Sequence, residues 1–269
     1  MKKTLVASVQ TFALTVSLAL LTPSAFAQAF DSVRLFGAAP GKDGGRAGLA
    51  VIAGQAYQGS DASRTMAVPL IEYRWANGWF AGSTNGIGYN FSDRQDMQYG
   101  ARLTADFGRK ENRSQALSGM GDIDAKAEFG GFFNYLLSRE VSLNTSLRYG
   151  SGQDRNGLLA DLVLGYSTEL SSALRLGLGV AATLANADYM QSYFGVTAAQ
   201  SVNSGYATYK PGAGLRDVRV NLSLTYRITP EISATAGVSA STLSGDASDS
   251  PLVRQKSTTT GLLAVAYSF

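Results

Sequence analysis

The chain contains no cysteine and no histidine among its 269 residues. Without cysteine there is no disulfide framework, no thiolate metal site and no attachment of a lipoprotein anchor. Without histidine, a Ser-His-Asp triad, an Asp-His pair and a His-bound metal are all excluded. These two absences predict that the protein is not an enzyme and uses no metal or other cofactor.

The first 27 residues have the three parts of a secretory signal peptide. Positively charged Lys2 and Lys3 precede an apolar stretch, and Ala25-Phe26-Ala27 is a small-x-small cleavage site. The alternative is an uncleaved membrane anchor over residues 4–21, but polar side chains dilute this stretch and no stop-transfer charges follow it. The sequence therefore predicts a cleaved signal peptide over residues 1–27.

Charge is scarce and nearly balanced in the mature chain, residues 28–269. Charged residues make up 16% of the sequence, and removal of the two signal-peptide lysines from the 23 basic residues leaves 21, against 20 acidic ones. A net charge near +1 gives no reason to expect nucleic acid as a partner. Apolar runs are short as well, because no later segment offers the ~18 residues that a membrane helix needs.

The sequence is instead rich in glycine, aromatic residues and alternating polarity. It has 30 Gly, 13 Tyr and 12 Phe, and in MQYGARLTADFG (residues 97–108) apolar and polar side chains alternate over eleven positions. This length suits a tilted strand that crosses a membrane. Similar stretches at 122–135, 140–149 and 219–228 also keep charges off their apolar faces. The pattern predicts an all-β protein, a transmembrane antiparallel β-barrel with lipid outside and a polar lumen inside.

About twelve strands are expected in this barrel. Ten or fourteen remain alternatives, because the hairpin at 79–92 is short and residues 187–197 could form part of a strand. A proline removes a ladder donor, so Pro69 is expected at a bulge. The other strands are predicted near 48–57, 66–75, 79–84, 86–92, 157–168, 171–184, 231–243 and 258–269.

The lengths of the connections predict how the barrel is oriented. Those at 138–140, 168–172 and 229–231 are short, as periplasmic turns are. Longer polar or glycine-rich connections are typical of extracellular loops, and residues 28–47 then form a periplasmic N-terminal segment. The longer connections lie around 109–121, 150–156, 185–213 and 244–256.

The chain ends in an apolar strand with an aromatic as its last residue. Leu263, Val265, Tyr267 and Phe269 share one face of this strand. A barrel leaves no free edge, because its last strand pairs with its first. A terminal Phe with apolar residues at alternate positions resembles the signal read by the barrel-assembly machinery of Gram-negative outer membranes. That machinery and outer-membrane lipid are therefore expected partners, and the cell outer membrane is the expected location.

The polar faces of the strands predict a set of charges in the lumen. Three acidic residues lie close together on one such face, so a carboxylate pair with a raised pKa is conceivable. Ion pairing with basic neighbours explains these residues better, and catalysis is not expected. The predicted lumen-facing charges are Arg102, Asp106, Asp122, Asp124, Lys126, Glu128 and Arg148.

The connection at 185–213 is the longest and carries several aromatic residues. Connections of this length without regular structure are usually functional. The aromatics could contact a partner, constrict the lumen, or pack against one another at the barrel rim, and the sequence leaves these alternatives open. They are Tyr189, Tyr193, Phe194, Tyr206 and Tyr209.

Four stretches are more specific than general barrel patterning. They are YQGSD at 57–61, GMGDIDAKAEFGGFFNY at 119–135, MQSYFGVTAAQSVNSGYATYKPGAGL at 190–215 and GDASDSPLV at 245–253. In this order, and over essentially the whole mature chain, the sequence resembles the MltA-interacting protein (MipA/OmpV) family of outer-membrane proteins. The resemblance implies an outer-membrane barrel. One member is a scaffold that joins a lytic transglycosylase to a peptidoglycan synthase, and others are described as antigens, adhesins or porin-like proteins.

Two functions are consistent with these observations. The first is a scaffold that docks murein-cleaving and murein-synthesising enzymes on its periplasmic face. The second is a narrow porin-like channel for small solutes, because about twelve strands lies between the filled eight-stranded barrel and the open pores of 16–18 strands. Short turns offer less than the ~800 Å² of a standard interface unless residues 28–47 contribute. The resemblance favours the scaffold, which is the function we expect.

Overall fold

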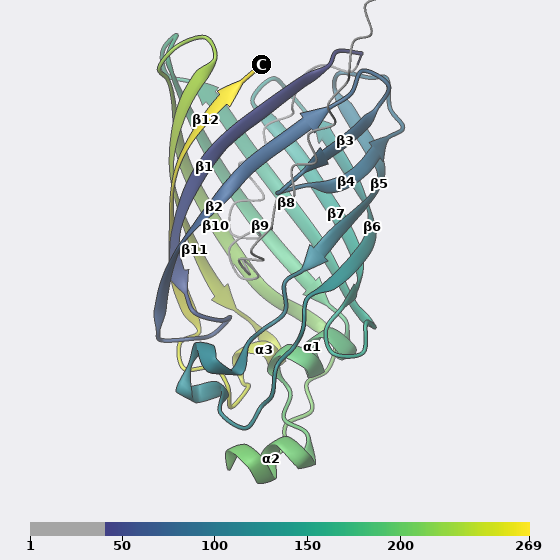
Figure 1. Cartoon of the computed structure of the whole chain (residues 1–269), viewed down its shortest axis with the longest axis vertical. Coiled ribbons are helices and arrows are strands. Elements are labelled where there is room, and N and C mark those ends of the chain that lie inside the picture. The colour runs from purple at the N-terminus through teal and green to yellow at the C-terminus, as the bar shows by residue number, and fades with distance from the viewer. Residues whose placement is uncertain (1–40) are drawn as a thin grey trace, which may run out of the picture.

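The computed structural model describes residues 41–269, and this part of the chain forms a closed barrel of twelve antiparallel strands (Figure 1). Neighbouring strands follow chain order, and β12 pairs with β1. The strands are β1 (Gly44–Gln55), β2 (Ser63–Arg74), β3 (Trp79–Gly82), β4 (Gly86–Asn90), β5 (Met97–Asp106), β6 (Lys126–Leu136), β7 (Val141–Ser151), β8 (Gly157–Glu169), β9 (Leu174–Ala185), β10 (Gly214–Arg227), β11 (Ile232–Leu243) and β12 (Ser257–Ser268).

The predicted fold class and the count of twelve strands are confirmed. The predicted signal peptide over residues 1–27 lies outside the described residues. Of the predicted periplasmic segment, residues 28–40 also lie outside them, and residues 44–47 are the first residues of β1. Among residues 41–269, no helix has both the length and the apolar character to cross a membrane.

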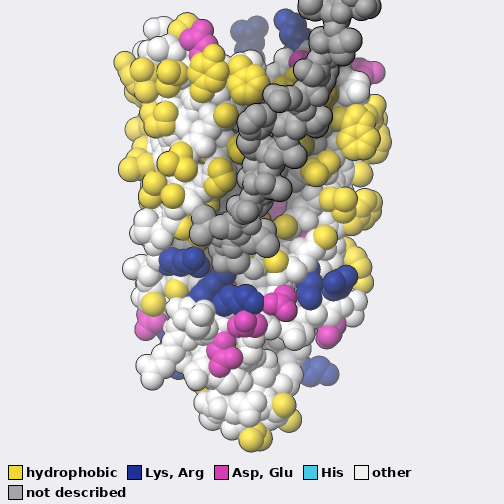
Figure 2. All heavy atoms as spheres, in the orientation of Figure 1, with side chains coloured by type: hydrophobic (Ala, Val, Ile, Leu, Met, Phe, Trp, Pro, Cys, Tyr) yellow, Lys and Arg dark blue, Asp and Glu magenta, His cyan; other side chains and the backbone are white. Residues whose placement is uncertain are grey.

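Alternation along each strand sorts the side chains into an apolar exterior and a polar interior. On β8, Leu162, Leu164 and Tyr166 point outward and are about half exposed. Asp161 and Val163, which alternate with them, are buried. Figure 2 shows the resulting apolar surface on one face of the barrel, with charged side chains gathered in a band beyond its lower edge. A surface of this kind faces the hydrocarbon of a bilayer.

Barrel closure depends on the last residue of the chain. The Phe269 N–H donates to the Gly45 carbonyl at 3.0 Å, and the Gly45 N–H donates back to a Phe269 carboxylate oxygen at 2.9 Å. The Phe269 ring lies over Gly45, where an added Cβ would come within 2.5 Å of it, and it contacts the rings of Tyr73 and Tyr267. Leu263, Val265, Tyr267 and Phe269 are all exposed on the outer face of β12.

The wall is incomplete between β2 and β5, because β3 and β4 are short and lie only in its upper half (Figure 1). β2 pairs with β3 over Glu72–Arg74 only, so within residues 41–269 its edge from Ser63 to Leu70 has no strand partner on that side. The Ile71 carbonyl accepts from the Ser83 N–H on this side of β2. Pro69 lies two residues earlier, so the N–H that a proline lacks would have pointed to the same side. The prediction of a bulge at Pro69 is wrong. Its register with Leu49 is regular, and the proline is tolerated because its edge is unpaired.

The two ends of the barrel differ as the lengths of the connections predict. The turns at 75–78, 91–96, 137–140, 170–173 and 228–231 lie at the end with the C-terminus, at the top of Figure 1. The helices of residues 41–269 lie at the opposite end, which the lengths of the connections predict to be extracellular. They are η2 (Glu111–Arg113), η3 (Gln115–Leu117), α1 (Ala187–Phe194), α2 (Ala198–Ser204) and α3 (Gly245–Ser248).

We expect Gly130→Ala to destabilise the barrel by about 1–3 kcal/mol, a typical effect of overpacking. A Cβ at Gly130 would come within 1.8 Å of the Leu147 carbonyl oxygen on β7, and only a backbone shift could relieve this clash. Gly131→Ala is the matched control, because its Cβ would approach nothing closer than the Gly100 oxygen at 3.4 Å. The measurement is the temperature at which each refolded variant changes mobility on a denaturing gel. Equal transitions for the two variants would contradict the packing described.

Candidate functional site

Arg148 is the centre of a buried ionic network on the lumen wall. Its guanidinium donates to Glu128 Oε2 at 3.0 Å and to Asp161 Oδ2 at 2.9 Å, which joins β6, β7 and β8. The Thr104 hydroxyl donates to the same Glu128 oxygen at 3.1 Å. Because burial of an unpaired charge is very costly, each of these groups depends on the others for its place in the wall.

The network continues onto β9 and β10, where the sequence did not reveal the parts played by Thr183, Arg216 and Asp217. The Thr183 hydroxyl donates to Asp161 at 2.7 Å and accepts from Arg219 at 2.9 Å. Arg219 and Arg216 both pair with Asp217, and the Arg216 side chain is completely buried. Arg216 and Asp217 are adjacent in sequence, and alternation would place one of them in lipid. A register shift between Leu215 and Asp217 breaks the alternation and brings both into the lumen.

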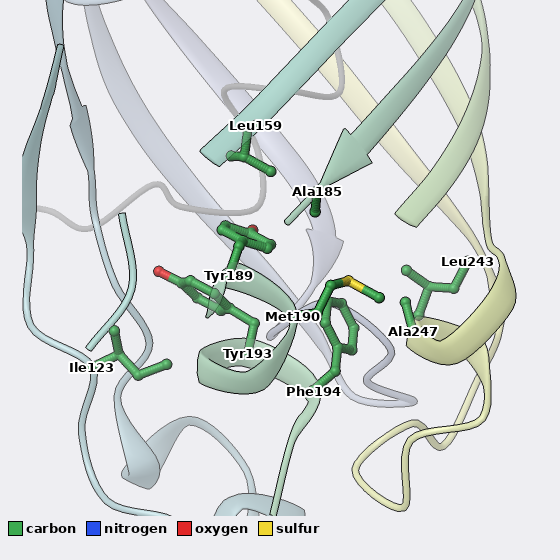
Figure 3. Close-up of a cluster of buried hydrophobic side chains, with 9 residues drawn as sticks. All are labelled: Ile123, Leu159, Ala185, Tyr189, Met190, Tyr193, Phe194, Leu243 and Ala247. Carbon is green, nitrogen blue, oxygen red and sulfur yellow. The ribbon is translucent and has the colours of Figure 1, made fainter. Parts of the chain in front are cut away.

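Helix α1 occupies the extracellular mouth of the barrel. The side chain of Asn186 caps its N-terminus by accepting from the Tyr189 N–H at 3.0 Å. The helix then packs its apolar side chains against strand ends and against α3, as Figure 3 shows. Met190 and Phe194 are buried, so this end of the lumen is filled by protein. The buried cluster is Ile123, Leu159, Ala185, Tyr189, Met190, Tyr193, Phe194, Leu243 and Ala247.

Polar contacts hold this plug to the barrel wall. The Tyr193 hydroxyl donates to the Asp106 carboxylate at 2.5–2.6 Å, and Arg109 donates to the Tyr193 carbonyl at 2.7 Å. The Arg216 guanidinium donates to the Tyr189 hydroxyl at 3.0 Å. Burial raises the pKa of Tyr189 to about 12, and burial together with nearby Asp106 raises the pKa of Tyr193 well above its ordinary value. Both tyrosines therefore stay protonated near neutral pH, and Tyr193 remains a hydrogen-bond donor.

Asp122 and Asp124 do not face the lumen, and this part of the prediction is wrong. β6 begins at Lys126, so both residues belong to the connection that precedes it. They accept from Lys110 Nζ at 3.0 and 2.8 Å near the surface. Gly108 has a left-handed φ of +65° and turns the chain out of the barrel wall after β5. The alternating pattern already begins at residue 122, before β6 begins at Lys126. The pattern alone therefore could not show where the strand starts.

The remaining predicted charges lie on the lumen side of the strands. Arg102 donates to Ser146 at 2.7 Å and lies over the Phe132 ring. Asp106 lies at the extracellular end of β5, and Lys126 faces it from the first position of β6. Among residues 41–269, no three acidic side chains gather closely enough to hold a metal ion.

The five loop aromatics separate into two groups. Tyr189, Tyr193 and Phe194 lie in the plug. Tyr206 and Tyr209 lie farther out and hold the loops together, since their hydroxyls donate to the Ala116 and Asp246 carbonyls at 3.0 and 2.7 Å. Residues 187–194 form helix α1, and the strand considered for residues 187–197 does not form.

The other end of the lumen holds a cavity of about 720 Å³. Its lining begins at the periplasmic rim, with the turn at 75–78 and Ser268, and reaches Arg102 and Asp161 near the middle of the barrel. The lumen is therefore asymmetric, with a plug at the extracellular end and a cavity at the periplasmic end.

Arg148→Gln is expected to destabilise the barrel by about 3–5 kcal/mol, because it leaves the buried Glu128 without its cation and removes the nearer of the two cations of Asp161. Arg175→Gln is the control. Its partner Glu169 is on the surface, where loss of an ion pair costs less than about 1 kcal/mol. Urea unfolding of both variants in lipid vesicles measures the difference. Similar midpoints would show that the ionic network does not stabilise the lumen wall.

The refolded mature chain, residues 28–269, is expected to show no discrete conductance steps in a planar bilayer, because α1 fills the extracellular mouth. Replacing Tyr189, Tyr193 and Phe194 together by alanine should produce steps. Val202→Ala, at an exposed position on α2, should leave the bilayer silent. Steps in the unaltered protein as frequent as those in the triple variant would contradict a sealed lumen.

A search of curated proteins found no match. Among solved structures, the chain is similar to a NanC porin, at 14% identity and a TM-score of 0.46 over 81% of this chain and 98% of that one. It is also similar to a KdgM porin, at 12% identity and a TM-score of 0.44, with 83% of this chain and 99% of that porin covered. A third similar structure is the CymD monoaromatic hydrocarbon channel, at 12% identity and a TM-score of 0.41, with 92% of this chain and 91% of that channel covered. These likenesses carry no conclusion about function.

A protein-family model gives the more specific result. The model described as "MltA-interacting protein MipA" matches residues 47–269, which is nearly all of the barrel. The protein therefore belongs to the MltA-interacting protein MipA family.

Proposed function

We propose that this protein is an outer-membrane anchor that holds a murein-cleaving lytic transglycosylase at the periplasmic face. The observation that carries the proposal is the asymmetry of the lumen, which α1 closes at the extracellular end and a cavity occupies at the periplasmic end. A barrel closed in this way presents its accessible interior to the periplasm. The description of the family names MltA, a lytic transglycosylase, as the interacting protein.

The chemistry of the lumen favours a structural role over an enzymatic one. Glu128 and Asp161 are engaged by Arg148, and no histidine is present to act as a base. Asp122 and Asp124 share Lys110 at the opposite end of the barrel from the cavity. A carboxylate held in a close ion pair favours its charged form and is a poor general acid.

The periplasmic turns by themselves make a small docking surface. The longest of them, residues 91–96, has six residues, and a standard interface needs about 800 Å² from each partner. Gly41, the first described residue, lines the cavity, so residues 28–40 connect directly to this face. We therefore place the docking surface on the periplasmic turns together with residues 28–40. A peptidoglycan synthase is the second partner that we expect at the same face.

Deletion of residues 28–40 should reduce co-purification with an MltA-type lytic transglycosylase at least tenfold, with the barrel still folded. The deletion must end before Gly45, because the backbone of that residue pairs with Phe269. Co-purification from lipid nanodiscs, followed by quantitative blotting, is the measurement.

The matched control replaces α2, residues 198–204, with a Gly-Ser linker at the extracellular end. This variant should retain full binding, because α2 lies on the opposite face of the membrane. Equal binding by both variants would exclude residues 28–40 from the interface. Absence of binding by the unaltered mature chain would overturn the proposed function itself.

A further inference from the structure

The wall of the periplasmic cavity carries a row of side-chain amides. Gln98 on β5, Asn134 on β6 and Asn144 on β7 are direct cross-strand neighbours, and all three line the cavity. Within residues 41–269, the Gln98 and Asn134 amides have no hydrogen-bond partner, and Asn144 donates only to Ser142 at 3.2 Å. Each amide offers both donors and an acceptor. The row is therefore free to bind groups that need both.

Two aromatic rings lie deeper in the barrel than this row of amides. Phe132 on β6 packs on Gly100, where a Cβ would come within 2.9 Å of the ring. Phe80 on β3 meets it edge to face, with the ring centroids 5.6 Å apart. Arg102 extends from the same wall and donates to Ser146 at 2.7 Å. Strands hold these groups in place, so the cavity combines fixed amides with a fixed apolar surface.

Charge around the cavity is balanced. Three basic and three acidic side chains line it, and one of each, Arg46 and Glu72, form an ion pair at 2.9 Å. A lining of this kind has no electrostatic preference for an anion or a cation. Its volume, about 720 Å³, lies within the range of about 300–1,000 Å³ for sites that enclose small organic ligands. The charged lining residues are Arg46, Glu72, Arg74, Asp93, Arg102 and Asp161.

We propose that this cavity binds N-acetylated glycan that enters from the periplasm and holds it through its uncharged N-acetyl and sugar-ring groups. An N-acetyl group offers one N–H and one carbonyl, which the amides of Gln98, Asn134 and Asn144 can match. The apolar face of a sugar ring fits against the Phe80 and Phe132 rings. The inference rests on the proposed function, since a murein-cleaving partner at the same face produces N-acetylated glycan.

The test uses chitotetraose as the probe and the mature chain in nanodiscs, with binding measured by calorimetry. We expect chitotetraose to bind at least tenfold more tightly than maltotetraose, which has no N-acetyl group. The double variant Gln98→Ala/Asn134→Ala should lose at least tenfold in affinity for chitotetraose, and its heat-modified mobility reports whether it has folded. Asn203→Ala, on α2 at the other end of the barrel, is the control and should bind normally.

Equal affinity for the two sugars would overturn the proposal, as would unchanged binding by the folded double variant. If the double variant does not fold, the comparison of the two sugars on the unaltered protein decides. Tighter binding of tetragalacturonate would replace the uncharged glycan with an acidic one and would also overturn the proposal. Co-purification with the transglycosylase is measured separately, so failure of the anchor function and failure of glycan binding are distinguishable.

Discussion

Backbone hydrogen bonding within the bilayer is the constraint on which the rest of this structure depends. Lipid offers no partner for an N–H or a carbonyl, so a sheet that spans the membrane must close on itself. Here closure joins β1 to β12, and the reciprocal bonds between Gly45 and Phe269 complete the ladder at the last residue of the chain. The C-terminal aromatic therefore contributes both a backbone pair and a ring on the outer face of the barrel.

Within residues 41–269, the edge of β2 between Ser63 and Leu70 is the exception to this constraint, because no strand pairs with it on that side. Pro69 lowers the cost at one position, because it has no N–H to leave unpaired, and just beyond this edge the Ser83 hydroxyl accepts from the Ile71 N–H. Irregular or unpaired backbone at membrane depth is tolerated where it lines a wet cavity or is covered by protein. The short β3–β4 hairpin thus makes the β2–β5 side the least regular part of the wall.

Closure also brings charges together inside a space that lipid cannot enter. Arg148, Glu128 and Asp161 come from three consecutive strands, and their pairing offsets the desolvation that burial imposes on each. The same wall extends through Arg216 and Asp106 to the plug, which they contact at Tyr189 and Tyr193. Within residues 41–269, a connected polar and apolar packing therefore occupies the extracellular half of the lumen, and most of the free volume lies on the periplasmic side. This asymmetry is the observation that supports the proposed anchor function.

The sequence by itself determined the barrel, a count of about twelve strands, the difference in connection length between its two ends and the lumen side of most of the predicted charges. These features follow from two-residue alternation and from the lengths of the connections, and both are local properties that a single chain displays directly. Only the tertiary structure decided that Asp122 and Asp124 leave the wall, that a bulge brings Arg216 and Asp217 inside together, and that α1 closes the mouth. Such features depend on contacts between segments far apart in the chain, as between Asp106 and Tyr193, which are 87 residues apart. Closure of the sheet creates these contacts, so no local pattern in the sequence could have predicted them.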